Sequence, residues 1–107
     1  MDLTDLAYEV TKKFPKDERF ALTSQLQRSA VSVSSNIAEG HGRHHLREYL
    51  HHLSIANGSL MELETQVAVA FRRRYIGSAE AQRCFDLSGD VGRLLAGLVR
   101  ALKARLP

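Results

Sequence analysis

Apolar residues recur at helical spacing through most of this 107-residue chain. The clearest stripe begins at Leu46, from which an apolar residue recurs at every seventh position as far as Val67. A second apolar residue follows each of these three positions later, as on one face of an α-helix. The pattern predicts one long helix over residues 44–74.

The two ends of the chain show shorter versions of the same pattern. Apolar residues at helical spacing between Cys84 and Leu102 predict a helix over residues 79–105. Near the start, a short stripe predicts a helix over residues 2–14, which Pro15 ends. Between the two long helices, Gly77 suits the position just past a helix end and Ser78 suits an N-cap.

The remaining segment is the most ambiguous in the chain. Apolar residues from Leu22 onward keep the helical period, but the valines and serines of residues 31–35 also alternate as in a strand. Serine and asparagine are mediocre helix formers because they compete for backbone hydrogen bonds. A single strand would have no partner here, so we predict a helix over residues 18–39, capped by Asp17 and stopped by Gly40.

These four helices and their short connections define the expected fold. Helices joined by short turns run antiparallel to their neighbours. We therefore predict an all-α protein in which residues 1–107 form a single domain, an antiparallel up-down-up-down four-helix bundle.

Composition narrows the possible environments and partners. No apolar run approaches the length that spans a bilayer, so we expect no membrane partner. The single cysteine, Cys84, excludes an internal disulfide and suits a reducing cytoplasm. The net charge is +3, and eleven of the fifteen basic residues are arginine. Such a balance admits nucleic acid as a partner without requiring it.

Four motifs in order along the chain resemble a known family. They read FPKDER, LTSQL, SNIAEG and SIANGSLMELET. This combination is similar to the small four-helix-bundle proteins encoded in intervening sequences of bacterial 23S ribosomal RNA genes, and through them to accessory proteins of diversity-generating retroelements. The resemblance implies a non-enzymatic bundle that forms a homo-oligomer, as a pentamer, and associates with nucleic acid. It implies no cofactor and no small-molecule substrate.

The first predicted helix is shorter than is usual in that family, so it can cover only half of the second helix. At the opposite end of the bundle, apolar side chains should stay partly uncovered and form an oligomer contact. The residues expected there are Val33, Ile37, Leu46, Leu50, Leu98 and Leu102.

The SNIAEGHG stretch invites a structural interpretation and a functional one. As a helix end, Asn36 and Glu39 would bond to unpaired backbone groups at the turn, and Gly40 and Gly42 would permit positive φ. The alternative is a contact with nucleic acid or another ligand. In the long helix that follows, Gly58 beside Asn57 predicts close approach of a neighbouring helix or subunit, with a ligand cleft as the alternative.

Basic residues should gather at one end of the bundle, where the first and third turns meet. Eight of them face three acidic residues, Asp17, Glu18 and Glu80, for a local charge of +5. They are Lys12, Lys13, Lys16, Arg19, Arg72, Arg73, Arg74 and Arg83. We predict that they bind nucleic acid; attraction to the negative ends of helix dipoles is the alternative explanation.

A second basic segment contains all five histidines: His41, His44, His45, His51 and His52. Arg43 and Arg47 lie among them and are further candidates for phosphate contact. On a helix His44 and Glu48 would share a face with His51 or His52, a pattern compatible with a metal ion but common, and basic neighbours oppose it. We predict no metal site.

Catalytic motifs are scarce. No phosphate-binding loop, nucleophile elbow or cysteine pair occurs, and Cys84 lies on an apolar helix face, as an inert core thiol would. Arg47 and His52 match the Arg-x4-His spacing of HEPN-type RNases, in which such residues serve phosphate stabilisation and acid–base chemistry. We expect a protein that is not an enzyme, with a small RNase or a pure protein-interaction module as the alternatives.

Overall fold

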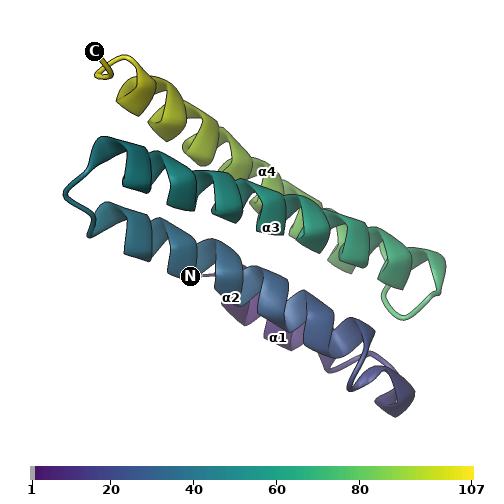
Figure 1. Cartoon of the computed structure of the whole chain (residues 1–107). Coiled ribbons are helices and arrows are strands. Elements are labelled where there is room, and N and C mark those ends of the chain that lie inside the picture. Colours follow the sequence, from purple (N-terminus) through teal and green to yellow (C-terminus); the bar gives the residue numbers. More distant parts are fainter. Residues whose placement is uncertain (1) are drawn as a thin grey trace.

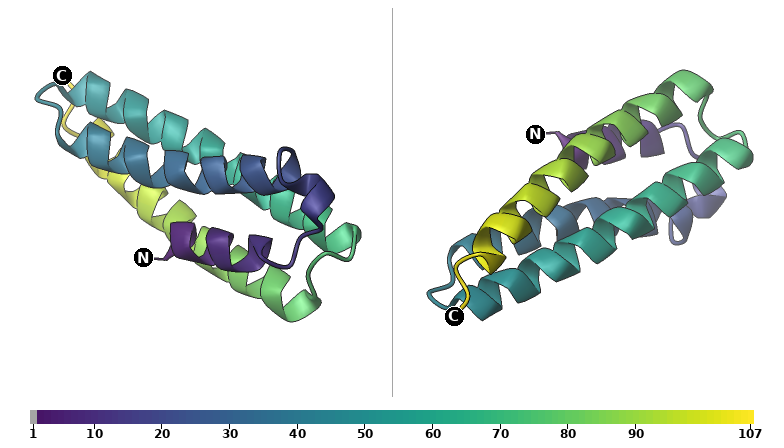
Figure 2. Two further views of the ribbon diagram at one scale, coloured as in Figure 1. Left: turned by 90° about the horizontal axis from the view of Figure 1, so that it is seen from below. Right: turned by 90° about the horizontal axis from the view of Figure 1, so that it is seen from above.

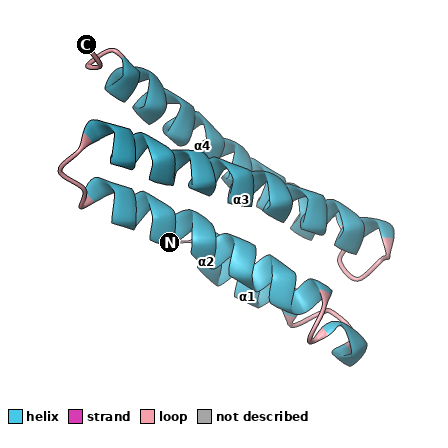
Figure 3. Ribbon diagram, in the orientation of Figure 1, coloured by secondary structure: helices cyan, strands magenta, loops and turns pink. Residues whose placement is uncertain are grey.

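Residues 2–107 are described by a computed structural model, and they form an all-α bundle (Figure 1). Within this range, the residues outside the helices lie in turns and loops, and none forms a strand (Figure 3). The α-helices are α1 (Leu3–Thr11), α2 (Leu22–His41), α3 (Leu46–Arg72) and α4 (Ser78–Lys103), and a short 3-10 helix, η1 (Lys16–Glu18), lies between α1 and α2. The predicted all-α four-helix bundle is confirmed.

The helices run up and down along an elongated molecule of 49 × 24 × 19 Å. In the views of Figure 2, α1 lies beside α2 and α4, while α3 occupies the opposite corner between the same two helices. Helix α1 reaches only halfway along the bundle, where the hydroxyls of Thr4 and Ser34 lie 3.4 Å apart. Beyond that level the bundle consists of α2, α3 and α4 alone.

The start of α2 differs from the prediction. The helix begins at Leu22, four residues later than the expected residue 18, because residues 16–18 form η1 instead. Asp17 does not cap it; the Leu22 N–H donates to Glu18 Oε1 at 3.4 Å. The capping carboxylate is therefore one residue further along than predicted.

Helix α2 also continues past its predicted stop. Gly40 is buried within the helix, and Gly42 ends it with φ −81°, so neither glycine adopts the positive φ that the sequence suggested. A Cβ on Gly40 would lie 2.9 Å from Tyr49 Cδ1 and 3.0 Å from His52 Cβ. Gly40 is needed for the close approach of α3, not for a turn.

The end of α3 is built on a Schellman motif with an arginine in the left-handed position. Arg74 has φ 63°, and the Tyr75 N–H donates to the Ala70 carbonyl at 2.9 Å. Gly77, expected just past this helix end, is instead the N-cap of α4, where its N–H donates to Glu80 Oε1 at 2.8 Å. Ser78 is consequently the first residue of α4 and not its cap.

A ladder of polar side chains joins α2 to α3. Asn36 Nδ2 donates to the Ser32 carbonyl at 2.9 Å, its Oδ1 lies 3.0 Å from His52 Nδ1, and the hydroxyls of Ser32 and Ser59 lie 2.7 Å apart. Because the Asn36 oxygen accepts, His52 Nδ1 carries the proton. Asn36 therefore bonds across the helix pair and not to the turn, and Glu39 pairs with Arg43 at 3.6 Å instead of bonding to backbone groups.

The end of the bundle beyond α1 is only partly as predicted. Val33 and Leu102, expected to be partly uncovered, are buried because α2, α3 and α4 still enclose them. The other four predicted residues are partly buried: Ile37, Leu46, Leu50 and Leu98. Leu94 on α4, which the sequence analysis did not single out, is 64% exposed.

Two glycine substitutions test the packing of α2 on α3. Gly40→Ala should lower the free energy of unfolding by about 1–3 kcal/mol, because the new methyl group has no room between the helices. Gly58→Ala is the matched control: nothing lies within 4 Å of a Cβ there, so the better helix former should raise stability by about 0.5–1 kcal/mol. Urea denaturation of both variants measures the difference. Equal effects of the two substitutions would contradict the close packing at Gly40.

Candidate nucleic-acid interface: the basic pole

The α1–α2 turn and the α3–α4 turn lie side by side at one end of the bundle, on the right in Figure 1. Polar side-chain contacts join them: Tyr75 O–H donates to Glu18 Oε2 at 2.7 Å, and Lys13 forms an ion pair with Glu80. The structure thus brings together the eight predicted basic residues, which we call the basic pole: Lys12, Lys13, Lys16, Arg19, Arg72, Arg73, Arg74 and Arg83.

Two of the eight cations are neutralised within the chain. Lys13 pairs with Glu80, and Arg83 Nη1 lies 3.3 Å from Glu9 Oε1, an acidic partner that the sequence analysis did not include. Within residues 2–107, no carboxylate comes within ion-pair distance of the other six. All six are exposed at the surface. These six define the part of the pole available to an anionic partner.

Tyr75 holds the pole together. Its ring packs against Phe14 of the α1–α2 turn, with 5.6 Å between centroids, and the Arg73 guanidinium of its own turn lies 5.8 Å from its centroid. The pKa of Glu18 is lowered, first by the hydrogen bond from Tyr75 and then by the Leu22 N–H and nearby Arg73. The side-chain interaction with Tyr75 also raises the pKa of Arg73.

The surface of the pole is hollowed beside the α3 end. The depression has a volume of about 590 Å³, and both basic and aromatic side chains line it. Arg72 and Arg74 stand on its wall together with Phe71 and Tyr75. A second exposed aromatic residue, Phe20, lies on the neighbouring turn with the Arg19 guanidinium 5.2 Å from its ring centroid. The sequence analysis missed these aromatics, although each adjoins an arginine in the chain.

The other predicted phosphate contacts lie at the opposite end of the bundle. Arg43 is paired with Glu39, and Arg47 is exposed on the first turn of α3. His41 Nδ1 lies 3.3 Å from the Tyr49 hydroxyl, and His52 belongs to the interhelical ladder with Asn36. The histidine segment therefore lies at the α2–α3 turn, where His41 and His52 make their contacts. Most of the bundle's length separates it from the basic pole.

Neither the metal alternative nor the RNase alternative gains support from this geometry. Within residues 2–107, no three His, Cys, Asp or Glu side chains converge in a way that could hold a metal ion. His52 is partly buried and hydrogen-bonded to Asn36, whereas Arg47 points from the exposed face of α3. The two side chains of the Arg-x4-His pair therefore lie in different environments.

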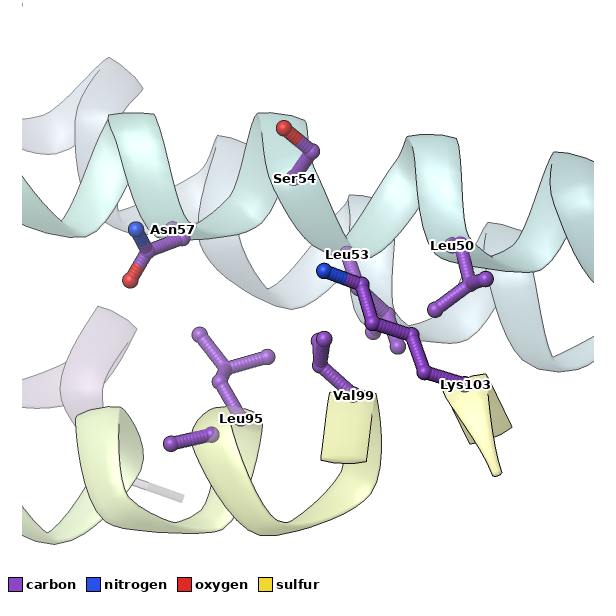
Figure 4. A pocket seen from close by; sticks show the side chains of 8 residues that line it. Leu50, Leu53, Ser54, Asn57, Leu95, Val99 and Lys103 are labelled. Atoms are coloured by element: carbon purple, nitrogen blue, oxygen red, sulfur yellow. The ribbon is translucent and has the colours of Figure 1, made fainter. Parts of the chain in front are cut away.

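A groove of about 310 Å³ separates α3 from the C-terminal half of α4 (Figure 4). Leu50, Leu53, Leu95 and Val99 form its apolar walls, with Asn57 and Lys103 at its margin. Close approach of a neighbouring helix does not explain the adjacent glycine, because a Cβ on Gly58 would meet nothing within 4 Å. Within the chain, that prediction for Gly58 is wrong.

Cys84 is buried in the core, as the sequence predicted. Burial raises the pKa of its thiol, with nearby Arg83 acting in the opposite direction. A thiol in this environment is a packing group and not a nucleophile. No helix within residues 2–107 is long and apolar enough to cross a membrane.

The fold and the pole define a basic, all-α four-helix bundle with a clustered cationic end. The family model of the 23S rRNA-intervening sequence proteins matches residues 1–97, and the chain belongs to that family. A crystal structure of a protein of unknown function from the S23 ribosomal protein family of Bacteroides thetaiotaomicron has the same fold: its TM-score is 0.77 at 20% identity, over 91% of this chain and 97% of that one. No curated protein gives a significant match.

Removing one hydroxyl tests the junction between the two turns. In Tyr75→Phe we expect the Glu18 pKa to rise toward its ordinary value, because the strongest hydrogen bond to the carboxylate is lost. In the wild type this bond stabilises the fold above the ordinary carboxyl pKa of about 4.3, and its contribution is lost as the pH falls through the lowered folded-state pKa. Wild type and variant should therefore differ in stability at neutral pH and converge in acid.

Carboxyl ¹³C NMR of Glu18 measures the pKa directly. Tyr8→Phe is the control, since Tyr8 is an exposed tyrosine on α1, away from Glu18. An unchanged Glu18 titration in Tyr75→Phe would contradict the junction.

Proposed function

We propose that this protein is a non-enzymatic, RNA-associated member of its family that binds RNA backbone through the basic pole, as a homo-oligomer in the cytoplasm. The observation that carries the proposal is the set of six cations that no carboxylate of residues 2–107 pairs with, on two turns joined by Tyr75. Arginine contacts phosphate oxygens in a bidentate manner, and clustered cations bind nucleic acid by releasing counterions.

Helix dipoles explain only part of the pole. Arg72 to Arg74 follow the C-terminal end of α3, where a positive charge is favourable. Lys16 and Arg19, in contrast, precede the N-terminus of α2, which is the positive end of that helix. The dipole of α2 is unfavourable for cations at this place, so it does not explain the clustering of Lys16 and Arg19. Binding of an anionic partner would explain it.

Assembly of several copies would strengthen such binding. Leu94 is 64% exposed, and Ile37 and Leu98 are only partly buried, in the region that α1 leaves uncovered. We infer that another copy of this chain covers this end, as the family resemblance implies for a pentamer. A ring of subunits would repeat the basic pole and present several phosphate-binding surfaces at once.

A charge-removing triple variant tests the RNA contact. Replacing Arg72, Arg73 and Arg74 with glutamine should weaken binding of all RNAs similarly, since phosphates carry no sequence information. The slope of log K against log salt should flatten by about 2–3, one unit for each lost phosphate contact. Filter binding or fluorescence anisotropy at about 50–200 mM salt gives both quantities.

The control removes the same charge elsewhere, by changing Arg93 and Arg100 in the second half of α4 and Arg105 just after it to glutamine. If only long-range electrostatic attraction contributed to binding, the two triple variants would bind RNA with equal affinity. A pole variant that binds RNA as tightly as the wild type would show that this end is not the RNA site.

A single exposed leucine tests the assembly. Leu94→Asp should shift the protein toward the 12.0 kDa monomer in analytical ultracentrifugation, because it places a charge in the proposed subunit contact at little cost to folding. Met61→Asp, at a position that is 61% exposed on α3, is the control and should leave the assembly intact. A wild type that already sediments as a monomer would refute the proposed contact.

A further inference from the structure

Phe20 is the most exposed large hydrophobic residue among those described, with 87% of its surface accessible. It lies in the α1–α2 turn, between η1 and the start of α2. Phe14, at the start of the same turn, and Leu22, the first residue of α2, are both buried in the core. The turn thus directs two apolar side chains inward and leaves a third in solvent, beside the Arg19 guanidinium.

A structural role within the chain does not explain Phe20. An apolar residue just before a helix N-cap often packs against the fourth residue of that helix, as a hydrophobic staple. Ala21 is the N-cap of α2, so the partner position is residue 25, which is an exposed glutamine. Phe20 therefore has no apolar partner at the position where a hydrophobic staple requires one.

The backbone around Phe20 is held in place. The Arg19 N–H donates to the Lys16 carbonyl at 3.1 Å, and the Ala21 N–H donates to the Glu18 carbonyl at 3.0 Å. Glu18 is itself fixed, since its carboxylate accepts from the Leu22 N–H and from the Tyr75 hydroxyl. The ring is therefore exposed on an ordered turn, which lowers the entropic cost of binding to it.

We propose that Phe20 is a stacking platform for an unpaired base of single-stranded RNA. The Arg19 guanidinium lies 5.2 Å from the ring centroid, and a base stacks against the remaining exposed face. Arg19 and the cations of the basic pole then contact the phosphates on either side of that nucleotide. This inference rests on the proposed function and adds the substrate class to it.

The chemistry of the surface favours single strands over duplexes. Bases in an A-form duplex are already stacked, so an exposed ring cannot reach their faces, whereas an unpaired base has its face available. Every base has such a face, so the contact is compatible with binding that ignores sequence. Phosphate contacts alone would not distinguish the two forms of RNA.

Phe20→Ala and Phe20→Leu separate stacking from mere apolar contact. For a single-stranded 12-nucleotide uridine oligomer, both variants should bind about tenfold more weakly than the wild type, as expected for the loss of one stacked base. For an RNA duplex without unpaired bases, their affinity should equal that of the wild type. The salt dependence should be unchanged for both RNAs, because no charge is removed.

A fluorescence experiment reports on the ring itself. The chain contains no tryptophan, so Phe20→Trp introduces a single indole at the proposed platform. The uridine oligomer should quench its emission and the fully paired duplex should not. Met61→Trp, at another exposed position, is the control and should respond to neither RNA.

The outcomes distinguish this inference from the proposed function. If Phe20→Ala binds the oligomer as tightly as the wild type, while the arginine triple variant binds it weakly, the basic pole is the RNA site and stacking is refuted. If neither variant weakens binding, the proposed function fails as well. A change in sedimentation caused by Phe20→Ala would place Phe20 in a protein contact and would equally overturn the platform.

Discussion

The close packing of α2 against α3 is the contact on which the rest of the structure depends. Gly40 lets the backbones approach where α3 begins, and the ladder from Asn36 through Ser32 to Ser59 fixes the register of the two helices. A change of register would separate these hydrogen-bonding groups and bury them without partners, at a cost of about 1–3 kcal/mol for each. Because α2 and α3 are antiparallel, fixing them at one end also sets which residues meet at the other. The start of α2 comes beside the end of α3, and the two turns of the basic pole are brought together.

At the basic pole, packing and charge act in opposite directions. Six cations that pair with no carboxylate of the described chain repel one another, yet the turns that carry them are joined by Tyr75 and Glu18 and by the Lys13–Glu80 pair. The left-handed Arg74 adds to the cost, since this conformation is unfavourable by roughly 1–2 kcal/mol for a residue with a Cβ. Glycine is the usual residue at this position of a Schellman motif. A local arrangement that is unfavourable in both charge and backbone conformation is often found at functional surfaces. Under the proposed function, RNA phosphates would relieve the repulsion.

The sequence predicted the fold better than it predicted the site. Hydrophobic periodicity placed α3 and α4 within two residues of their ends, and short connections dictated the antiparallel order, so the grouping of basic residues at one end followed from topology alone. Capping was less predictable: Asp17 is the better cap residue by propensity, yet it is the Glu18 carboxylate that accepts from the Leu22 N–H, and Glu18 also accepts from the Tyr75 hydroxyl. Asn36 was expected to bond unpaired backbone groups at a turn and Gly40 to allow a positive φ there, whereas both residues contact α3. The exposure of Phe20 depends on the exact residue at which α2 begins, which periodicity does not resolve.

RNA is proposed to bind at the basic pole, the end of the bundle formed by the two joined turns. Chemical-shift mapping by NMR tests this most directly. Backbone amide resonances of the ¹⁵N-labelled protein would be followed by transverse-relaxation-optimised NMR while a single-stranded uridine oligomer is added. Binding at the basic pole predicts that the largest shifts fall in residues 12–20 and 71–77, with little change in the histidine segment of residues 41–52. Shifts concentrated in the histidine segment, or spread along the exposed faces of α3 and α4, would contradict it.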